Sequence, residues 1–199
     1  MLARTRMVLG VLCLAAIAAV AVGCGPSVHN ITVRSAASVT SAPDAATIVV
    51  IQPSTRYGSV NLLSATGELL GQINDRSATI VRVPPGPFRL YAIPERQASW
   101  GQRIEGTVDA GRVYFATIGM HWGGITFLAL NPRSRDDRWA QRDQYLSSVP
   151  MVMMDPGQIP MAVHEIGNAQ ELIMRVDQNM DRLDPEHQAE HLVQASDGL

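Results

Sequence analysis

Short apolar runs separated by turn-forming residues dominate the chain from Ala46 to Leu130, and they constrain its fold more than any other feature. The run Val113–Ile118 is rich in β-branched and aromatic residues, and the run Thr47–Ile51 closes at Gln52 and Pro53. Turn residues recur roughly every 8–12 positions, a spacing that is typical of β-sandwiches. The expected strands are Thr47–Ile51, Ser59–Leu63, Glu68–Ile73, Thr79–Val83, Phe88–Ile93, Arg103–Val108, Val113–Ile118 and Ile125–Leu130.

Successive side chains of a strand point to opposite faces, so the sequence also predicts which residues share a face. In the strand Val113–Ile118, Val113 and Phe115 share one face and Ile118 lies on the other. No helical period competes before Asn131. We therefore expect a mainly-β domain over residues 46–130, an antiparallel β-sandwich of the immunoglobulin or transthyretin type that folds by itself.

The pattern becomes helical after Asn131. Ser134 is expected to cap a helix that runs to about Ser147, and Asn168 is expected to cap a second helix. Helical spacing is kept by the apolar residues Ala169, Leu172, Ile173, Val176, Met180 and Leu183.

Asp184 and Pro185 start a third helix, with proline in the first turn, where its missing N–H is tolerated. Val149–Met161 is an apolar loop or short strand. Residues 131–199 are thus expected to form a short helical C-terminal extension, and deleting Asp184–Leu199 is expected to leave the sandwich folded.

The N-terminus has the layout of a secretory signal, because Arg4 and Arg6 precede an uncharged run of 16 residues, Met7–Val22. A membrane-spanning helix needs about 20 apolar residues. The tetrad Ala21–Cys24 resembles the bacterial lipobox, in which a branched residue and two small residues precede a cysteine that accepts a diacylglyceryl group; Ala21 replaces the usual leucine. The alternatives are an ordinary signal peptide cut nearby and an uncleaved anchor.

The lipobox implies a signal peptide over residues 1–23 and a mature chain that begins at lipidated Cys24. Residues 24–45 contain little to pack and are expected to be a flexible tether. In Gram-negative lipoproteins an aspartate after the cysteine favours the inner membrane, so Gly25 points to the outer membrane, on its periplasmic or surface side.

Charge and cysteine content exclude some classes of function. Removing Arg4 and Arg6 leaves 14 basic and 18 acidic residues, and this net charge of −4 argues against a nucleic-acid partner. The other cysteine, Cys13, lies in the signal, so the mature chain has one thiol and no internal disulfide. No sequence motif indicates a cofactor.

Three segments resemble bacterial β-sandwich lipoproteins of the PEGA type and, more closely, the lipoprotein family called domain of unknown function 2846. They are the Pro-Pro-Gly corner Val83–Leu90, the hairpin Thr107–Phe115 and the turn Ala65–Gly71. The resemblance covers about Ala46 to Gly119. It implies a small sandwich exposed at the surface or in the periplasm, and it transfers no catalytic residues.

Two groups of side chains could bind a metal. His187, Glu190 and His191 spell the inverted zinc-protease motif, but a helical wheel turns both histidines to solvent, away from Ala189, Leu192 and Val193. Met151, Met153, Met154, Met161 and His164 could offer thioethers and imidazole to Cu(I), although methionine also fills gaps in apolar cores.

Two other groups could form a binding surface. Trp100, His121 and Trp122 lie at or between strands, where exposed aromatic residues would mark a binding patch. Four arginines, at positions 133, 135, 138 and 142, alternate with aspartates and favour a self-paired, solvated helix face over contact with anions.

The sequence favours a lipid-anchored, non-enzymatic binding or scaffolding module of the cell envelope, with an envelope protein as its possible partner. The alternative is a periplasmic copper- or zinc-binding protein that uses residues 151–164 or the C-terminal histidines.

Overall fold

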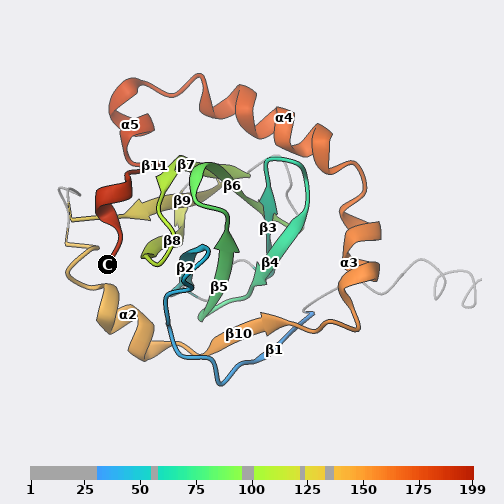
Figure 1. Cartoon of the computed structure of the whole chain (residues 1–199). Helices are drawn as coiled ribbons and strands as arrows, with labels where there is room; N and C mark the ends of the chain where they lie inside the picture. Colours follow the sequence, from blue (N-terminus) through green and yellow to red (C-terminus); the bar gives the residue numbers. More distant parts are fainter. Residues whose placement is uncertain (1–30, 55–57, 96–100, 122–123, 133–136) are drawn as a thin grey trace, which may run out of the picture.

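A computed structural model describes residues 31–54, 58–95, 101–121, 124–132 and 137–199 (Figure 1). Two sheets make up most of this part of the chain. The six-stranded sheet has the order β1 (Thr32–Arg34), β10 (Met151–Met154), β5 (Ser77–Val83), β2 (Ala46–Gln52), β8 (Val113–His121) and β9 (Gly124–Leu130). The five-stranded sheet has the order β11 (Leu192–Val193), β7 (Gln102–Val108), β6 (Gly86–Pro94), β3 (Val60–Ser64) and β4 (Leu69–Ile73).

The two sheets pack face to face around the main hydrophobic core, which confirms the predicted mainly-β sandwich. The largest wholly buried side chains of this core include Ile48, Leu62, Leu90 and Phe127, which come from both sheets. The sheets are mixed rather than purely antiparallel. Strand β2 runs parallel to β8, β10 parallel to β5, and β11 parallel to β7, because each of these pairs is joined by a long excursion of the chain rather than a hairpin.

The outer faces of both sheets are also covered. Alternate residues of β2 belong to different clusters: Ile48 and Val50 face the interior, and Val49 and Ile51 pack on the outer side. Every residue of β2 is therefore buried, as its continuous apolar run requires. In β8, Tyr114 lies in the interior with Ile118, and the outer cluster contains Val113 and Phe115. The predicted faces of Val113, Phe115 and Ile118 are confirmed.

The chain after Asn131 provides these outer layers and encircles the sandwich (Figure 1). Its helices are α2 (Arg142–Ser148), α3 (Ile159–Ile166), α4 (Ala169–Met180) and α5 (Pro185–Ala189), and a 3₁₀ turn follows at Ala195–Asp197. Helices α3 and α4 bury Ala162, Ile173, Val176 and Met180 against the five-stranded sheet. The segment around α2 covers the six-stranded sheet through Trp139, Tyr145 and Leu146.

Three strands outside residues 46–130 correct the expected division of the chain. Thr32–Arg34, expected in a flexible tether, form β1 and pair with β10. Strand β10 pairs with β1 and β5 and also contacts β4 of the other sheet, and the segment that leads into β11 bridges β7 and β9. The Ala129 amide donates to the Glu190 carbonyl oxygen (3.1 Å), and the Glu105 amide donates to that of His191 (3.1 Å). These strands thus cover the side of the sandwich between β5 and β4 and the side between β7 and β9. Their hydrogen bonds pair backbone groups that an open edge would leave free.

The helical predictions are partly right. Asn168 caps α4 by accepting from the Glu171 amide (3.3 Å), and Asp184 caps α5 by accepting from the His187 amide (3.0 Å). The first helix is shorter than predicted, since α2 begins at Arg142; Ser134 lies outside the described residues. Helix α3 was not predicted, because its proline masks the pattern, yet Pro160 stands in the first turn, where a missing N–H does no harm.

Candidate functional site

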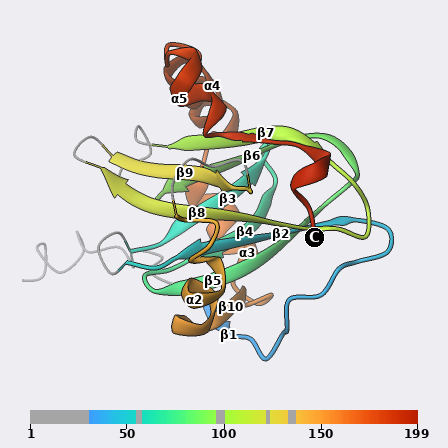
Figure 2. The same ribbon diagram turned by 90° about the vertical axis from the view of Figure 1, so that its left-hand side faces the viewer.

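Several connections between strands meet at one end of the sandwich, the end at which β2 and β8 finish. The register places Gln52 of β2 opposite Ser77 of β5, and Val60 of β3 opposite both Ile73 of β4 and Pro94 of β6. The hairpin from β8 to β9 turns at the same end, at the left of Figure 2. Loops held by a rigid scaffold are common places for binding, so this strand end is the candidate functional site.

The predicted aromatic patch is distributed over two of these connections. In the sequence, Trp100 lies between β6 and β7, and Trp122 lies between β8 and β9. Both residues fall outside the described part of the chain, as does the side chain of His121, whose backbone ends β8 opposite Gly124. The described strand ends on either side of both connections lie at the same end of the sandwich.

A polar cluster that the sequence analysis missed fills the described part of this end. Asp75, in the turn between β4 and β5, accepts at Oδ1 from Gln52 Nε2 (2.9 Å) and from the Gly58 amide (3.1 Å). Gln52 is wholly buried, and its Oε1 has no hydrogen-bond partner among the described residues. Ser54 is half-buried, and its covered hydroxyl oxygen also has no partner there. Buried polar atoms are nearly always hydrogen-bonded, so these two acceptors could take a donor from water or a ligand.

Further polar residues secure the same end from inside the five-stranded sheet. Gln72 Nε2 donates to Asn61 Oδ1 (3.0 Å), and Gln72 Oε1 accepts from the Ile31 amide (3.0 Å). Ser59 Oγ donates to Asn74 Oδ1 (3.0 Å). Amides, hydroxyls and one carboxylate give this end a hydrogen-bonding chemistry. The signal in the sequence was the presence of Gln52, Asn61 and Gln72 inside otherwise apolar strands.

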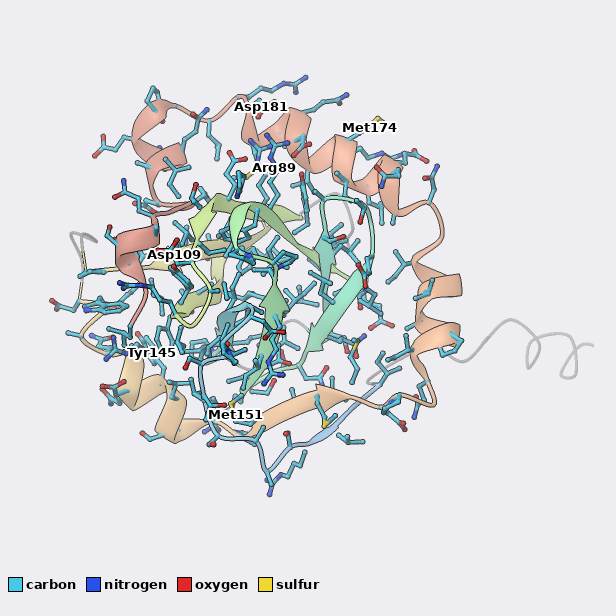
Figure 3. All side chains as sticks on the ribbon, in the orientation of Figure 1. Arg89, Asp109, Tyr145, Met151, Met174 and Asp181 are labelled. Atoms are coloured by element: carbon cyan, nitrogen blue, oxygen red, sulfur yellow. The ribbon has the colours of Figure 1, made fainter. Side chains whose placement is uncertain are left out.

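A second polar cluster lies between the five-stranded sheet and α4. The nearly buried Arg103 of β7 donates from Nη1 to Asp177 Oδ1 (2.5 Å) and from Nη2 to both Asp181 Oδ1 (2.8 Å) and Glu105 Oε1 (3.1 Å). Arg89 Nε donates to Glu105 Oε2 (2.8 Å), and Figure 3 shows Arg89 below the helix that carries Asp181. This network attaches α4 to the sheet, and its carboxylates are engaged by arginines, so we assign it a structural role.

The network also shifts the pKa values of its members. Burial alone would lower the pKa of Arg103, but hydrogen bonds to Asp181, Asp177 and Glu105 outweigh it, and the pKa is raised. Burial, followed by its hydrogen bond to Asp177 (3.0 Å), raises the pKa of Tyr91 to about 12. Arg103 therefore stays charged and Tyr91 stays protonated at physiological pH.

Replacing Asp177 should release much of the attachment of α4. Asp177→Asn removes the charge that neutralises Arg103, and we expect it to lower the free energy of unfolding by about 2 kcal/mol, less than a fully buried pair because Asp177 is 27% exposed. Asp181→Asn is the matched control, since Asp181 is 67% exposed, and should cost about 0.5 kcal/mol. Urea unfolding measures both. A loss of unfolding free energy for Asp177→Asn as small as that for Asp181→Asn would show that the network does not hold the helix.

The structure separates the two C-terminal histidines. His187 is exposed, as predicted, and its pKa is raised by hydrogen bonding to Asp184, whose Oδ2 lies 2.7 Å from Nδ1. His191 contradicts the helical wheel, because it is buried with Nδ1 2.7 Å from the Phe127 carbonyl oxygen. The wheel extended the helix through residue 193, but α5 ends at Ala189 and the chain then enters the sheet. Burial lowers the pKa of His191 and keeps it neutral.

The three described members of the predicted copper-binding group, Met151, Met153 and Met154, have different surroundings. Of the predicted loop or short strand Val149–Met161, residues 151–154 form the strand β10, and the end of the range begins helix α3 at Ile159. Met151 packs against the outer cluster of the six-stranded sheet, Met154 packs against that of the five-stranded sheet, and Met153 is exposed. The side chains of Met161 and His164 lie outside those described. Among the described residues, no three His, Cys, Asp or Glu side chains are grouped as metal ligands would be.

The arginine-rich segment is partly self-paired, as predicted, since Arg142 Nε donates to Asp143 Oδ1 (2.9 Å), but Arg142 is only 16% exposed and thus less solvated than predicted. The guanidinium carbon of Arg142 lies 4.2 Å from the ring centroid of Trp139 and 5.1 Å from that of Phe115, so its charge rests over aromatic faces. Arg138 Nη2 lies 3.7 Å from Glu190 Oε2. Arg133 and Arg135 fall outside the described residues.

Neither a scan against protein-family models nor a search of curated proteins found a match to this chain. Within residues 31–54, 58–95, 101–121, 124–132 and 137–199, every helix is too short or too polar to cross a bilayer.

Proposed function

We propose that the protein is a lipid-anchored lipoprotein of the bacterial cell envelope and that it works as a binding or scaffolding module rather than as an enzyme. The tetrad Ala21–Cys24, after a short apolar run with two preceding arginines, supports the anchor. Two acyl chains on one cysteine hold a protein stably at a membrane. Gly25 favours the outer membrane where the source has two. The resemblance of residues 46–119 to PEGA-type lipoproteins agrees with this class.

The observation that carries the proposal is that Ile31, close after Cys24 in the sequence, belongs to the sandwich. Ile31 is buried, its amide donates to Gln72 Oε1, and its carbonyl oxygen accepts from the Asp155 amide (2.7 Å). Ile31 is seven residues after Cys24 in the sequence. Such a spacing places a compact domain directly beside an N-terminal lipid.

The binding role is supported by the polar strand end. The acceptors of Gln52 and Ser54, and the carboxylate of Asp75, lie at the end of the sandwich where the strands that flank Trp100 and Trp122 in the sequence also end. Hydrogen-bonding groups at the end of a rigid sandwich suit recognition of a polar partner, such as an envelope protein, better than bond cleavage.

Acylation tests the anchor directly. In a bacterium that processes lipoproteins, the wild-type protein should partition into membranes and its N-terminal peptide should carry a diacylglyceryl Cys24. Cys24→Ser should abolish both the adduct and the partition, because its hydroxyl cannot form the thioether. Mass spectrometry of the N-terminal peptide measures the outcome.

Cys13→Ser is the matched control, since Cys13 lies inside the signal, and it should leave acylation unchanged. An unmodified wild-type N-terminus at or after residue 24 would refute the anchor.

A further inference from the structure

An exposed apolar pair lies on the outer face of the sheet at β1, the first strand of the described residues. Val33 of β1 and Met153 of β10 are directly opposite in register, and they are 44% and 48% exposed. Cross-strand neighbours on one face lie within side-chain contact distance. Two neighbouring apolar side chains exposed on one face can insert at the boundary between lipid head groups and acyl chains.

Strand β1 is held firmly enough to fix this pair in place. The Ser35 amide donates to the Met151 carbonyl oxygen (2.9 Å), and the Asp155 amide donates to that of Ile31 (2.7 Å), so both ends of β1 are attached to the segment that contains β10. The buried side chain of Ile31 adds an apolar attachment. The point at which a lipid tether would enter the domain is therefore fixed relative to Val33 and Met153.

The length of chain before β1 determines which side of the domain can reach the membrane. Seven residues from Cys24 to Ile31 span at most about 25 Å, even when fully extended. A compact domain of this size has a radius of gyration of about 15 Å and is roughly 40 Å across. Helix α4 lies on the opposite side of the sandwich from β1 and β10 in both views (Figures 1 and 2). A tether this short keeps the β1 side nearer to the membrane than the α4 side.

We propose that the outer face of the β1–β10 pair, formed by Val33 and Met153, is the surface that rests on the lipid bilayer. This inference rests on the proposed lipid anchor at Cys24. Contact through two side chains would be weak for a free protein, but a short tether makes it intramolecular, with an effective concentration of about a millimolar. The strand end with Gln52 and Asp75 is then left free for a partner.

Cys24 permits a direct test, because it is the only thiol of residues 24–199. The mature chain is coupled through Cys24 to a maleimide lipid in phosphatidylcholine–phosphatidylglycerol vesicles. A benzophenone amino acid replaces Met153, Val33 or, as the matched control, Met174 of α4, which is 56% exposed and points away from the sandwich (Figure 3). After irradiation, lipid adducts are counted by mass spectrometry. The use of two reporter positions guards against a variant that fails to fold, which thermal melting detects.

We expect at least fivefold more lipid adduct at positions 33 and 153 than at 174 in coupled protein, and little at any position when coupling is omitted. Equal adduct at 153 and 174 would overturn the proposal, and so would crosslinks from 153 to a second protein molecule instead of lipid. Because the anchor is imposed chemically, this result is independent of acylation in cells. An unmodified native Cys24 would refute the anchor, whereas a failed crosslink with native acylation present would refute only the contact surface.

Discussion

Gly106→Ala is expected to destabilise the protein by about 3 kcal/mol or more and to displace its last ten residues. A Cβ atom built at Gly106 would lie 1.9 Å from the Val193 carbonyl oxygen and 2.8 Å from its carbonyl carbon, and both are backbone atoms. The Gly106 φ of +150° adds strain for any other residue. Strand β11 cannot accommodate the methyl group and must leave β7.

Displacement of β11 is costly because the segment is part of the sandwich. Val193 belongs to the main hydrophobic core, and His191 is buried against Phe127. At the end of the chain, Val113 and Leu199 exchange backbone hydrogen bonds (3.0 and 3.1 Å), and Arg112 Nη1 donates to the Gly198 carbonyl oxygen (2.8 Å). The structure therefore argues against the expectation that Asp184–Leu199 can be deleted without harm. We expect this deletion to destabilise the sandwich strongly.

Two controls make the test specific. Gly157→Ala places its Cβ no closer than 3.4 Å to Asp155 Oδ1 and should change stability by less than about 1 kcal/mol. In a chain that ends at Ala189, Gly106→Ala should lose most of its effect, because the clashing carbonyl is gone. Chemical unfolding of five proteins gives the comparison: wild type, the two full-length variants, and the shortened chain with Gly106 or with alanine at that position. A Gly106→Ala protein as stable as wild type would mean that β11 does not pair with β7.

The sequence predicted the strands well because each carries its own period and turns. The strand predicted at Thr47–Ile51 corresponds to β2, and the one at Val113–Ile118 lies within β8. Helix caps were also readable, since Asn168 and Asp184 bind amides three residues away. Local patterns of this kind need no knowledge of the rest of the fold.

The features that the sequence did not predict depend on contacts with residues far away in the chain. Two-residue β11 and three-residue β1 are too short to show a period, and they are strands only because β7 and β10 offer backbone groups to them. The same holds for His191, whose burial follows from its place beside β9 rather than from its helix. Gln52 and Asp75 were missed because they are 23 positions apart and meet only when β2 and β5 pair.

Phe115→Ala should lower the free energy of unfolding by about 3–5 kcal/mol, a large part of the stability of a domain of this size. Phe115 is 5% exposed and packs on the outer face of the six-stranded sheet with Val49 and Leu130. Its ring meets that of Trp139 edge-on, with centroids 6.2 Å apart and planes at 76°. The loss should therefore include the attachment of the segment that leads into α2.

A double-mutant cycle separates this attachment from ordinary core packing. Phe115→Ala and Trp139→Ala should be coupled by about 0.5–1.5 kcal/mol, because each removes the partner of the other. Phe127→Ala is the matched control: Phe127 is wholly buried in the interior core, so its loss should be as large, and its coupling to Trp139→Ala should be near zero. Thermal or urea unfolding of the single and double variants measures both couplings. If Phe127 coupled to Trp139 and Phe115 did not, the faces of the six-stranded sheet would be the reverse of those described, and the C-terminal segment would not cover its outer side.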